Sequence, residues 1–389
     1  MSSIAGSPAV TAEGRTVRLD SLTGLRWWAA FAVFAYHMRN LAPLPHSGIF
    51  VYGNYGVTFF FILSGFVLTW SARPSVAPTT FWWRRFARIY PSHFVALLFA
   101  IPVFYSFDPD PAQTWVKPVS FGILALSFVF LQGWSRDPAI LFSGNPAAWT
   151  LSCEAFFYAL HPALHRAFQG LTKRGALWAT VGVIALAFAY RIAVIAWPSS
   201  WLGSLPLPIT RVSEFIIGIG IARAMIAGWK VRIKPLWAYL LGAGLILWVF
   251  ISVRWEGDNA VVRFILQTSN EWIIIACAVT IAAVAWRDVT GGQSILRWRP
   301  LVVLGEWSYA FYLVHATFVY IALSLFGGQR TAWSNLLWYA ALLALSLAGA
   351  AALHYLIEKP FERYMRAWWD ARLKRKQLAR SATSAESST

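Results

Sequence analysis

The chain consists of long apolar runs joined by short polar loops, and this pattern limits the folds open to it. A helix that crosses a bilayer needs ~20 mainly apolar residues to span the ~30 Å hydrocarbon core. Hydrophobic residues make up 58% of the sequence and charged residues 13%, which excludes an ordinary soluble domain. We therefore predict an all-α membrane protein with about ten transmembrane helices. The runs that reach spanning length are 24–43, 55–72, 89–107, 149–168, 177–197, 209–227, 236–253, 268–286, 301–324 and 335–357.

The basic residues predict the orientation of the chain. Lys and Arg concentrate in the cytoplasmic loops of membrane proteins. If both termini lie in the cytoplasm, most of the 33 basic residues fall on the cytoplasmic side. A further, shorter run at 119–134 would move the later basic loops outside if it crossed the membrane. We expect it to form one short re-entrant or interfacial helical segment on the outer side, beside a cavity that shields its backbone.

The chain divides into three parts. Residues 1–20 are small and polar without periodicity, which predicts a disordered cytoplasmic N-terminus. Residues 21–365 are predicted to form the transmembrane domain, and residues 366–389 a cytoplasmic tail that is basic and then rich in Ser and Ala. The net charge of +17 lies in short loops between apolar runs, so we interpret it as a topology signal and expect no nucleic-acid partner.

The first apolar run carries two ionisable residues. Arg26 stands at its start, and His37 follows eleven residues later. At ~1.5 Å rise per residue the two lie about 16 Å apart, so His37 is expected about halfway across the membrane. A residue with that chemistry at that depth usually serves function. The alternative is a neutral histidine that bonds a neighbouring carbonyl.

The fourth run places four polar residues on one helix face. Glu154, Tyr158, His161 and His165 follow one another at i, i+4, i+7 and i+11. A carboxylate beside an imidazole would raise its basicity, as a general base requires, and Glu154 is expected at a depth similar to that of His37. His165 is interpreted as structural. Zinc is a weak alternative, because the pattern is not HExxH and no third ligand is evident, so we expect no metal.

The second and third runs offer candidates for binding a ligand. Ser64 and Gly65 interrupt an apolar helix, where they either allow close helix packing or open the wall of a substrate channel. Arg85 and Arg88 are three residues apart on one predicted helix face, a geometry suited to clamping phosphate. Ordinary cytoplasmic charge is the alternative for the arginines. Arg26 is expected at the same membrane face and could join the clamp.

The last two runs carry further polar residues. Ser308, Tyr309, Tyr312 and His315 cluster in the ninth run, either lining a cavity or bonding within the bundle. In the last run, His354 and Glu358 form an i, i+4 pair just before Pro360. Because proline breaks helices, we expect a helix terminus there and not a site.

Together these pieces resemble the acyltransferase-3 family of integral membrane O-acyltransferases. The resemblance covers residues 19–365 and implies the stand-alone form, without an appended hydrolase-like domain. The pieces that carry it, in the order of the family, are Arg26 with His37, FFILSG at 60–65, RFAR at 85–88, WTLSCE at 149–154, SYAFYLVH at 308–315 and EKPFE at 358–362.

The resemblance implies a reaction and roles for the site residues. Acyl-CoA, often acetyl-CoA, would be the donor, with its phosphates held by Arg85, Arg88 and Arg26 and its arm passing Ser64 and Gly65. His37 would act as general base, oriented or buffered by Glu154. The remaining polar residues would line the substrate cavity: Tyr158, His161, Ser308, Tyr309, Tyr312 and His315.

The resemblance also implies a location and classes of acceptor. The protein would lie in the bacterial plasma membrane and acylate a hydroxyl of a surface polysaccharide, a glycolipid or a glycosylated natural product such as a macrolide. The acyl group could move directly or through an acyl-histidine, and the resemblance is compatible with both routes. A proton-coupled glycolipid transporter or flippase is the alternative function, although the sequence lacks the internal repeats typical of transporters.

Overall fold

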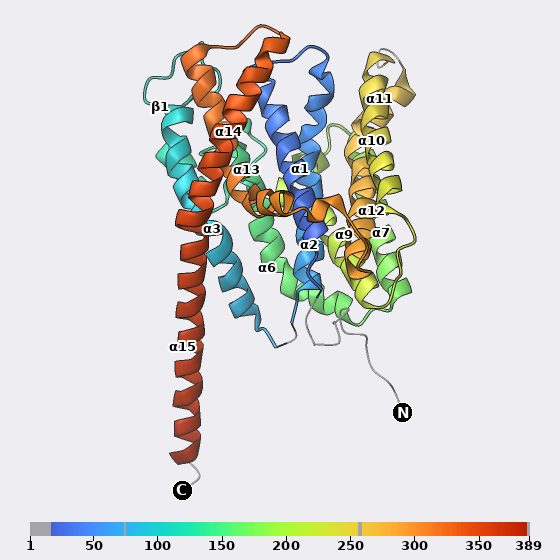
Figure 1. Cartoon of the computed structure of the whole chain (residues 1–389), viewed down its shortest axis with the longest axis vertical. Helices are drawn as coiled ribbons and strands as arrows, with labels where there is room; N and C mark the ends of the chain where they lie inside the picture. The colour runs from blue at the N-terminus through green and yellow to red at the C-terminus, as the bar shows by residue number, and fades with distance from the viewer. Residues whose placement is uncertain (1–16, 74, 256–258, 387–389) are drawn as a thin grey trace.

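The computed structural model describes residues 17–73, 75–255 and 259–386. Most of the predicted disordered segment 1–20 therefore lies outside the described residues. Each predicted apolar run coincides with a helix (Figure 1). These helices are α1 (Asp20–Met38), α2 (Gly56–Trp70), α3 (Pro78–Phe104), α6 (Trp149–Gln169), α7 (Lys173–Ala196), α9 (Val212–Ile226), α10 (Pro235–Ser252), α12 (Ser269–Val289), α13 (Arg299–Phe326) and α14 (Leu336–Ala352).

Within the described part of the chain, 7 helical segments are long and apolar enough to cross a membrane. The chain is thus a multi-pass membrane protein, but the predicted count of about ten spans is not confirmed. The helices α1, α6 and α9 fall outside this set; α9 has only 15 residues, and α6 carries polar side chains along its length. The segments that qualify are Ser47–Trp70, Pro78–Phe104, Lys173–Ala196, Pro235–Trp255, Ser269–Val289, Arg299–Phe326 and Trp333–Ala379.

The run at 119–134 forms α4 (Phe121–Phe128), a helix of 8 residues. At ~1.5 Å per residue α4 is about 12 Å long, too short to cross the ~30 Å core. It belongs to a layer of short elements at one end of the bundle, together with two parallel two-residue strands. This layer comprises β1 (Tyr105–Ser106), β2 (Lys117–Pro118), η2 (Gln132–Trp134), α5 (Pro138–Leu141) and η3 (Pro146–Ala148).

The remaining short helices connect the longer ones. They are η1 (Ser47–Tyr55), η4 (Trp201–Ser204), α8 (Leu207–Thr210), η5 (Val253–Trp255), α11 (Ala260–Gln267), η6 (Ile295–Arg297) and η7 (Trp333–Asn335).

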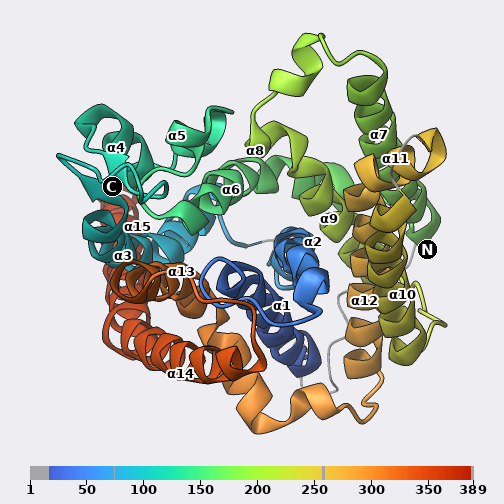
Figure 2. The same ribbon diagram turned by 90° about the horizontal axis from the view of Figure 1, so that it is seen from above.

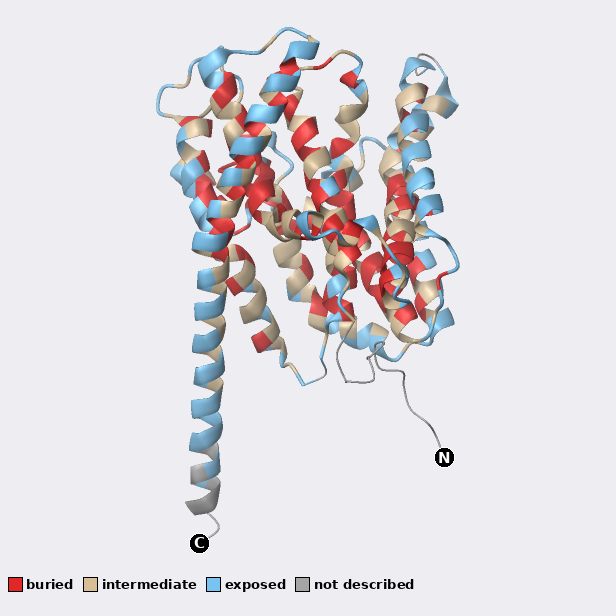
Figure 3. Ribbon diagram, in the orientation of Figure 1, coloured by how far each residue is buried: buried red, intermediate tan, exposed pale blue. Residues whose placement is uncertain are grey.

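Helices α1 and α2 form the centre of the bundle. Seen from above, α13 and α14 lie to one side of them and α9 and α12 to the other (Figure 2). The large rings of Phe34 and Phe311 belong to one buried hydrophobic cluster, and the ring of Phe66 belongs to another. The outward faces of α7 and α10 expose apolar side chains, whereas buried residues concentrate in the interior (Figure 3). This distribution fits a lipid-facing surface around a partly polar interior.

The contact between α2 and α9 depends on glycines. A Cβ atom added at Gly65 would lie 2.0 Å from the carbonyl oxygen of Phe215, and one added at Gly218 would lie 2.0 Å from that of Ile62. The two backbones therefore approach closely at both positions. This placement explains Gly65 by helix packing, one of the two alternatives left open by the sequence.

We expect Gly65→Ala to destabilise the protein, because the methyl group would push α9 away from α2. Overpacking of this kind typically costs about 1–3 kcal/mol. The measurement is thermal unfolding of the purified protein in detergent, where the apparent Tm should fall. Gly182→Ala on α7 is the matched control, since no atom lies within 4 Å of its added Cβ. Equal Tm values for both variants would contradict the packing role.

The end of α14 differs from the sequence prediction. The helix does not stop at Pro360: a π-helical turn (Leu353–Glu358) leads directly into α15 (Lys359–Glu386), which extends beyond the bundle (Figure 1). The expected helix terminus was therefore wrong. A π turn already departs from the i→i−4 hydrogen-bond ladder, so the missing N–H of Pro360 is tolerated there. The start of α15 packs on α3, where Trp83 stacks on Trp369 at 5.3 Å.

Candidate active site

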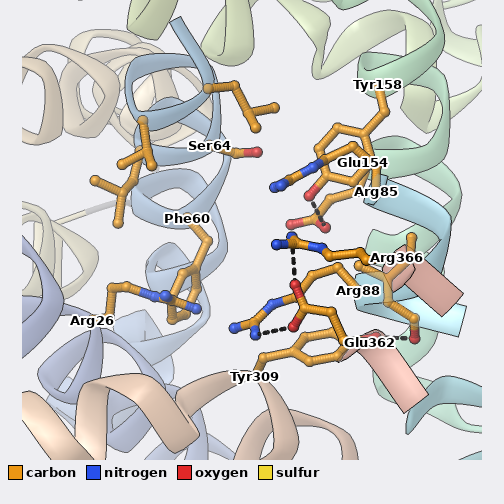
Figure 4. A pocket seen from close by; sticks show the side chains of 14 residues that line it. Arg26, Phe60, Ser64, Arg85, Arg88, Glu154, Tyr158, Tyr309, Glu362 and Arg366 are labelled. Atoms are coloured by element: carbon orange, nitrogen blue, oxygen red, sulfur yellow. Dashed lines mark hydrogen bonds and ion pairs between the residues drawn. The ribbon is translucent and has the colours of Figure 1, made fainter. Parts of the chain in front are cut away.

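Polar side chains from six helices surround a cavity of about 340 Å³, here called the arginine cavity (Figure 4). Arg26, Phe60 and Ser64 face Arg85 and Arg88 across it. The arginine cavity brings together residues from runs far apart in the sequence. Its polar lining consists of Arg26, Ser64, Arg85, Arg88, Glu154, Tyr158, Tyr309, Glu362 and Arg366.

The two arginines of the RFAR sequence differ in their partners. Arg88 forms ion pairs with Glu358 at 2.8 Å and with Glu362 at 2.9 Å. Glu358 is fully buried and also accepts a hydrogen bond from Nδ1 of His354 at 2.9 Å. Arg88 is thus neutralised from within the protein. The pair of His354 and Glu358, expected at a helix end, instead supports the wall of the arginine cavity.

Arg85 and Arg26 make no ion pair with any residue that the structure describes. Nε of Arg85 is buried without a hydrogen-bond partner. On the same side of the cavity as Arg85, the hydroxyl of Tyr158 donates to Oε2 of Glu154 at 2.8 Å (Figure 4). The free guanidinium groups of Arg26 and Arg85 leave the cavity with uncompensated positive charge suited to an anionic ligand.

A narrow connecting cavity of about 60 Å³ leads from the arginine cavity toward the other end of the bundle. It shares Arg26, Phe60, Glu154 and Tyr309 with the arginine cavity. Ser308 lies on its wall, with its hydroxyl donating to the carbonyl oxygen of Gly305 at 2.8 Å.

A third cavity, here called the histidine cavity, has a volume of about 540 Å³ and contains His37. It shares Val57 and Tyr312 with the connecting cavity, so the three cavities follow one another through the bundle. Asn40 and Asn54 are exposed, which shows that the histidine cavity reaches the protein surface. Its polar and aromatic lining is Tyr36, His37, Asn40, Asn54, Phe104, Trp115, Lys117, Phe142, Trp149, Arg211, Tyr312 and Tyr320.

The neighbour of His37 is a second histidine. The rings of His37 and His315 are 5.2 Å apart, and Nδ1 of His315 lies 3.1 Å from the carbonyl oxygen of Phe311. An imidazole beside a carbonyl must donate, so His315 carries its proton on Nδ1. Nδ1 of His37 is buried without a partner, which leaves Nε2 as the nitrogen open to the histidine cavity.

Other predicted site residues lie elsewhere. Glu154 lines the arginine and connecting cavities and accepts a hydrogen bond from Tyr158, whereas His37 lines the histidine cavity. Gly65 faces α9, whereas Ser64 faces the arginine cavity. His161 lies on the face predicted for it, but about 10 Å further along α6 than Glu154, and lines a fourth cavity.

The site contains residues that the sequence reasoning missed. Glu358, Glu362 and Arg366 stand at i, i+4 and i+8 and contact or line the arginine cavity. The four-residue spacing of these side chains is the signal in the sequence that points to them. It places them on one helix face, provided that the helix continues past Pro360. Among the described residues, no group of three His, Cys, Asp or Glu side chains could hold a metal ion.

The fold and these cavities define a class of protein, a multi-pass membrane protein with an arginine-lined cavity and a histidine-lined cavity inside its helical bundle. Comparison with known sequences specifies the class further. The model of the acyltransferase-3 family, described as an acyltransferase domain, matches residues 19–355. The chain belongs to this family and is an acyltransferase.

Two relatives illustrate the range of the family. Acyltransferase MdmB of Streptomyces mycarofaciens is 34% identical, and the match covers 90% of this chain and 93% of MdmB. Peptidoglycan O-acetyltransferase OatA of Listeria monocytogenes is 25% identical over 76% of this chain, but the match covers only 49% of OatA. No solved structure matches the chain.

Proposed function

We propose that this protein is an O-acyltransferase that moves an acyl group, most simply acetyl, from acyl-CoA to a hydroxyl of a carbohydrate-containing acceptor. The observation that carries the proposal is the line of three cavities between the free arginines and His37. The relatives named as acyltransferases agree with the reaction class.

The arginine cavity supplies the donor site in this proposal. Arg85 and Arg26 would bind phosphate oxygens of coenzyme A, since neither has an internal ion pair. Arg26 and His37 lie on the same helix, eleven residues and about 16 Å apart. An extended pantetheine arm can cover that separation, so its thioester would reach His37 through the connecting cavity.

The histidine cavity supplies the acceptor site. Trp115 and Trp149 offer flat apolar faces of the kind that pack on sugar rings, and Asn40 and Asn54 offer amide groups for hydroxyls. A neutral, hydroxyl-rich acceptor fits this lining. Surface glycans, glycolipids and glycosylated natural products such as macrolides all belong to that class, and one relative is named a peptidoglycan O-acetyltransferase.

The proposed chemistry needs one base. Nε2 of His37 takes the proton of the acceptor hydroxyl as its oxygen attacks the thioester carbonyl carbon. The C–S bond breaks, the acyl group forms an ester with the acceptor, and the thiolate receives the proton from His37. His315 would position the His37 ring, because the two imidazole rings lie next to each other. Glu154 would act in the arginine cavity, bonded to Tyr158.

We place the protein in the cell membrane with the arginine cavity toward the cytoplasm and both termini on that side. Arg26 at the start of α1 and Arg366 on α15 line one cavity, so both ends of the described chain approach the same face. The basic loops and the basic tail favour the cytoplasm for that face.

The test is turnover of acetyl-CoA by the purified full-length protein in detergent. We expect release of free thiol that depends on an added hydroxyl-rich acceptor, together with an ester product detected by mass spectrometry. Longer acyl-CoA donors, run in parallel, identify the acyl chain. Flux of a glycolipid across reconstituted vesicles without thiol release from any donor would favour the transporter alternative.

A further inference from the structure

A fourth cavity, here called the stacked-ring cavity, adjoins the arginine cavity. It has a volume of about 710 Å³ and shares Leu68 and Arg85 with the arginine cavity. Both volumes lie within the ~300–1,000 Å³ typical of small-molecule sites. Arg73 and Arg166 are exposed at the stacked-ring cavity, which shows that it opens to the surface.

The charge of the stacked-ring cavity is positive. Arg73, Arg84, Arg85 and Arg166 line it, and none of the described residues that line it carries a carboxylate. Only Arg84 has an ion pair with a described residue, at 3.3 Å from Asp370. Several free guanidinium groups without a local counter-charge are suited to binding a phosphate-bearing ligand.

Three rings form a stack in the wall of this cavity. The ring of His161 lies 4.8 Å from that of Phe81 at an angle of 19°, and 5.6 Å from that of His165 at 18°. His161 is buried, whereas Phe81 and His165 are half-buried and line the cavity. Flat rings of this kind are what nucleobases stack on, with little dependence on the base.

We propose that the stacked-ring cavity binds the 3′-phosphoadenosine end of the donor. This inference rests on the proposed function and deepens it by assigning the two ends of coenzyme A to two cavities. The adenine stacks on an end ring of the column, Phe81 or His165, and the 3′-phosphate binds Arg73 and Arg166. Arg85, which both cavities share, binds the diphosphate at the junction.

The arginine cavity is less suited to the whole coenzyme. It is about half as large, at about 340 Å³ against about 710 Å³. Its lining includes Glu154, which has no ion pair with a described residue and whose carboxylate would oppose a second phosphate group. The polar face of α6 extends beyond the arginine cavity to His161 and His165. The stacked-ring cavity gives these two histidines a role, because both line it.

The first test measures binding of adenosine 3′,5′-bisphosphate to the full-length protein in neutral detergent by calorimetry. The variant combines Arg73→Gln with Arg166→Gln, two exposed side chains without ion pairs to described residues. We expect its Kd to rise about ten-fold or more. Lys173→Gln with Arg174→Gln is the matched control, because these exposed residues lie close in sequence but do not line the cavity. Equal Kd values for the variant and the wild type overturn the proposal.

The second test compares donors. We expect the variant to raise KM for acetyl-CoA about ten-fold while leaving its kcat, and its KM for 3′-dephospho-acetyl-CoA, near the wild-type values. S-acetylpantetheine, which lacks the nucleotide, should not distinguish the two proteins. An equal loss with all donors, or an effect seen only when vesicles of anionic phospholipid are added, overturns the proposal.

The two tests separate this inference from the proposed function. If the bisphosphate binds through Arg73 and Arg166 but no thioester turns over, the nucleotide site stands and the acyl-CoA reaction falls. If acetyl-CoA turns over but the variant binds the bisphosphate normally, the reaction stands and this site falls.

Discussion

Replacing His37 by alanine is expected to lower the rate of acyl transfer about 10²–10⁴-fold, the range typical of a lost general base. His37 lines the histidine cavity, and its Nδ1 is buried without a partner, so Nε2 is the nitrogen available to an acceptor hydroxyl. The measurement is kcat for thiol release from acetyl-CoA in the presence of acceptor. Donor binding should stay near the wild-type value, since the residues assigned to the donor line the arginine and stacked-ring cavities, and His37 lines neither.

A variant of His315 separates the catalytic role of His37 from the positioning role of His315. His315 is buried and lies 5.2 Å from His37, but it does not line the histidine cavity. We expect His315→Asn to lower kcat less than His37→Ala and to change its pH dependence, because the amide can still donate toward Phe311 but cannot titrate. A His37→Ala protein that keeps full activity and a normal fold would exclude His37 as the base.

The second large effect concerns Arg85. We expect Arg85→Ala to raise KM for acyl-CoA about 10–100-fold, the equivalent of ~1.5–3 kcal/mol for a hydrogen bond to a charged group. Its guanidinium has no ion pair with a described residue and lines both the arginine and the stacked-ring cavities. Steady-state kinetics with acetyl-CoA measures the effect, and Arg85→Lys should recover part of it by restoring the charge.

Arg88 provides the contrast. Because it neutralises the buried Glu358 and also pairs with Glu362, its removal would leave uncompensated negative charge inside the protein. Arg88→Ala should therefore lower Tm, whereas Arg85→Ala should leave Tm nearly unchanged. A KM that rises for Arg88→Ala at normal Tm, with no change for Arg85→Ala, would reverse the roles of the two arginines.

Local patterns were sufficient for the framework of this protein. Each apolar run of spanning length became a helix, since a segment of that composition has to satisfy its own backbone hydrogen bonds in a membrane. The spacing of Arg26 and His37 along α1 likewise follows from the constant rise of a helix. Both residues line cavities, the arginine cavity and the histidine cavity respectively.

The pairings between helices could not be read from the sequence in the same way. Glu154 was expected beside His37, yet His315 from α13 occupies that place and Glu154 bonds Tyr158. His161 shares a helix face with Glu154 but lines another cavity, because a face shared along one helix passes different neighbours at different depths. Gly65 could have served either packing or a channel until α9 was placed against it.

The sequence by itself therefore determined the class of fold, the family and the spacing of Arg26 and His37 along α1, because apolar length, charge and helical rise are local properties of the chain. The tertiary structure decided which guanidinium groups are free and which histidine neighbours the proposed base. The sequence does not distinguish Arg85 from Arg88, because both lie on one helix face. Glu358 and Glu362 pair with Arg88 because the helix continues through Pro360 into α15. Ion pairing of this kind depends on distances between distant segments, which packing alone sets.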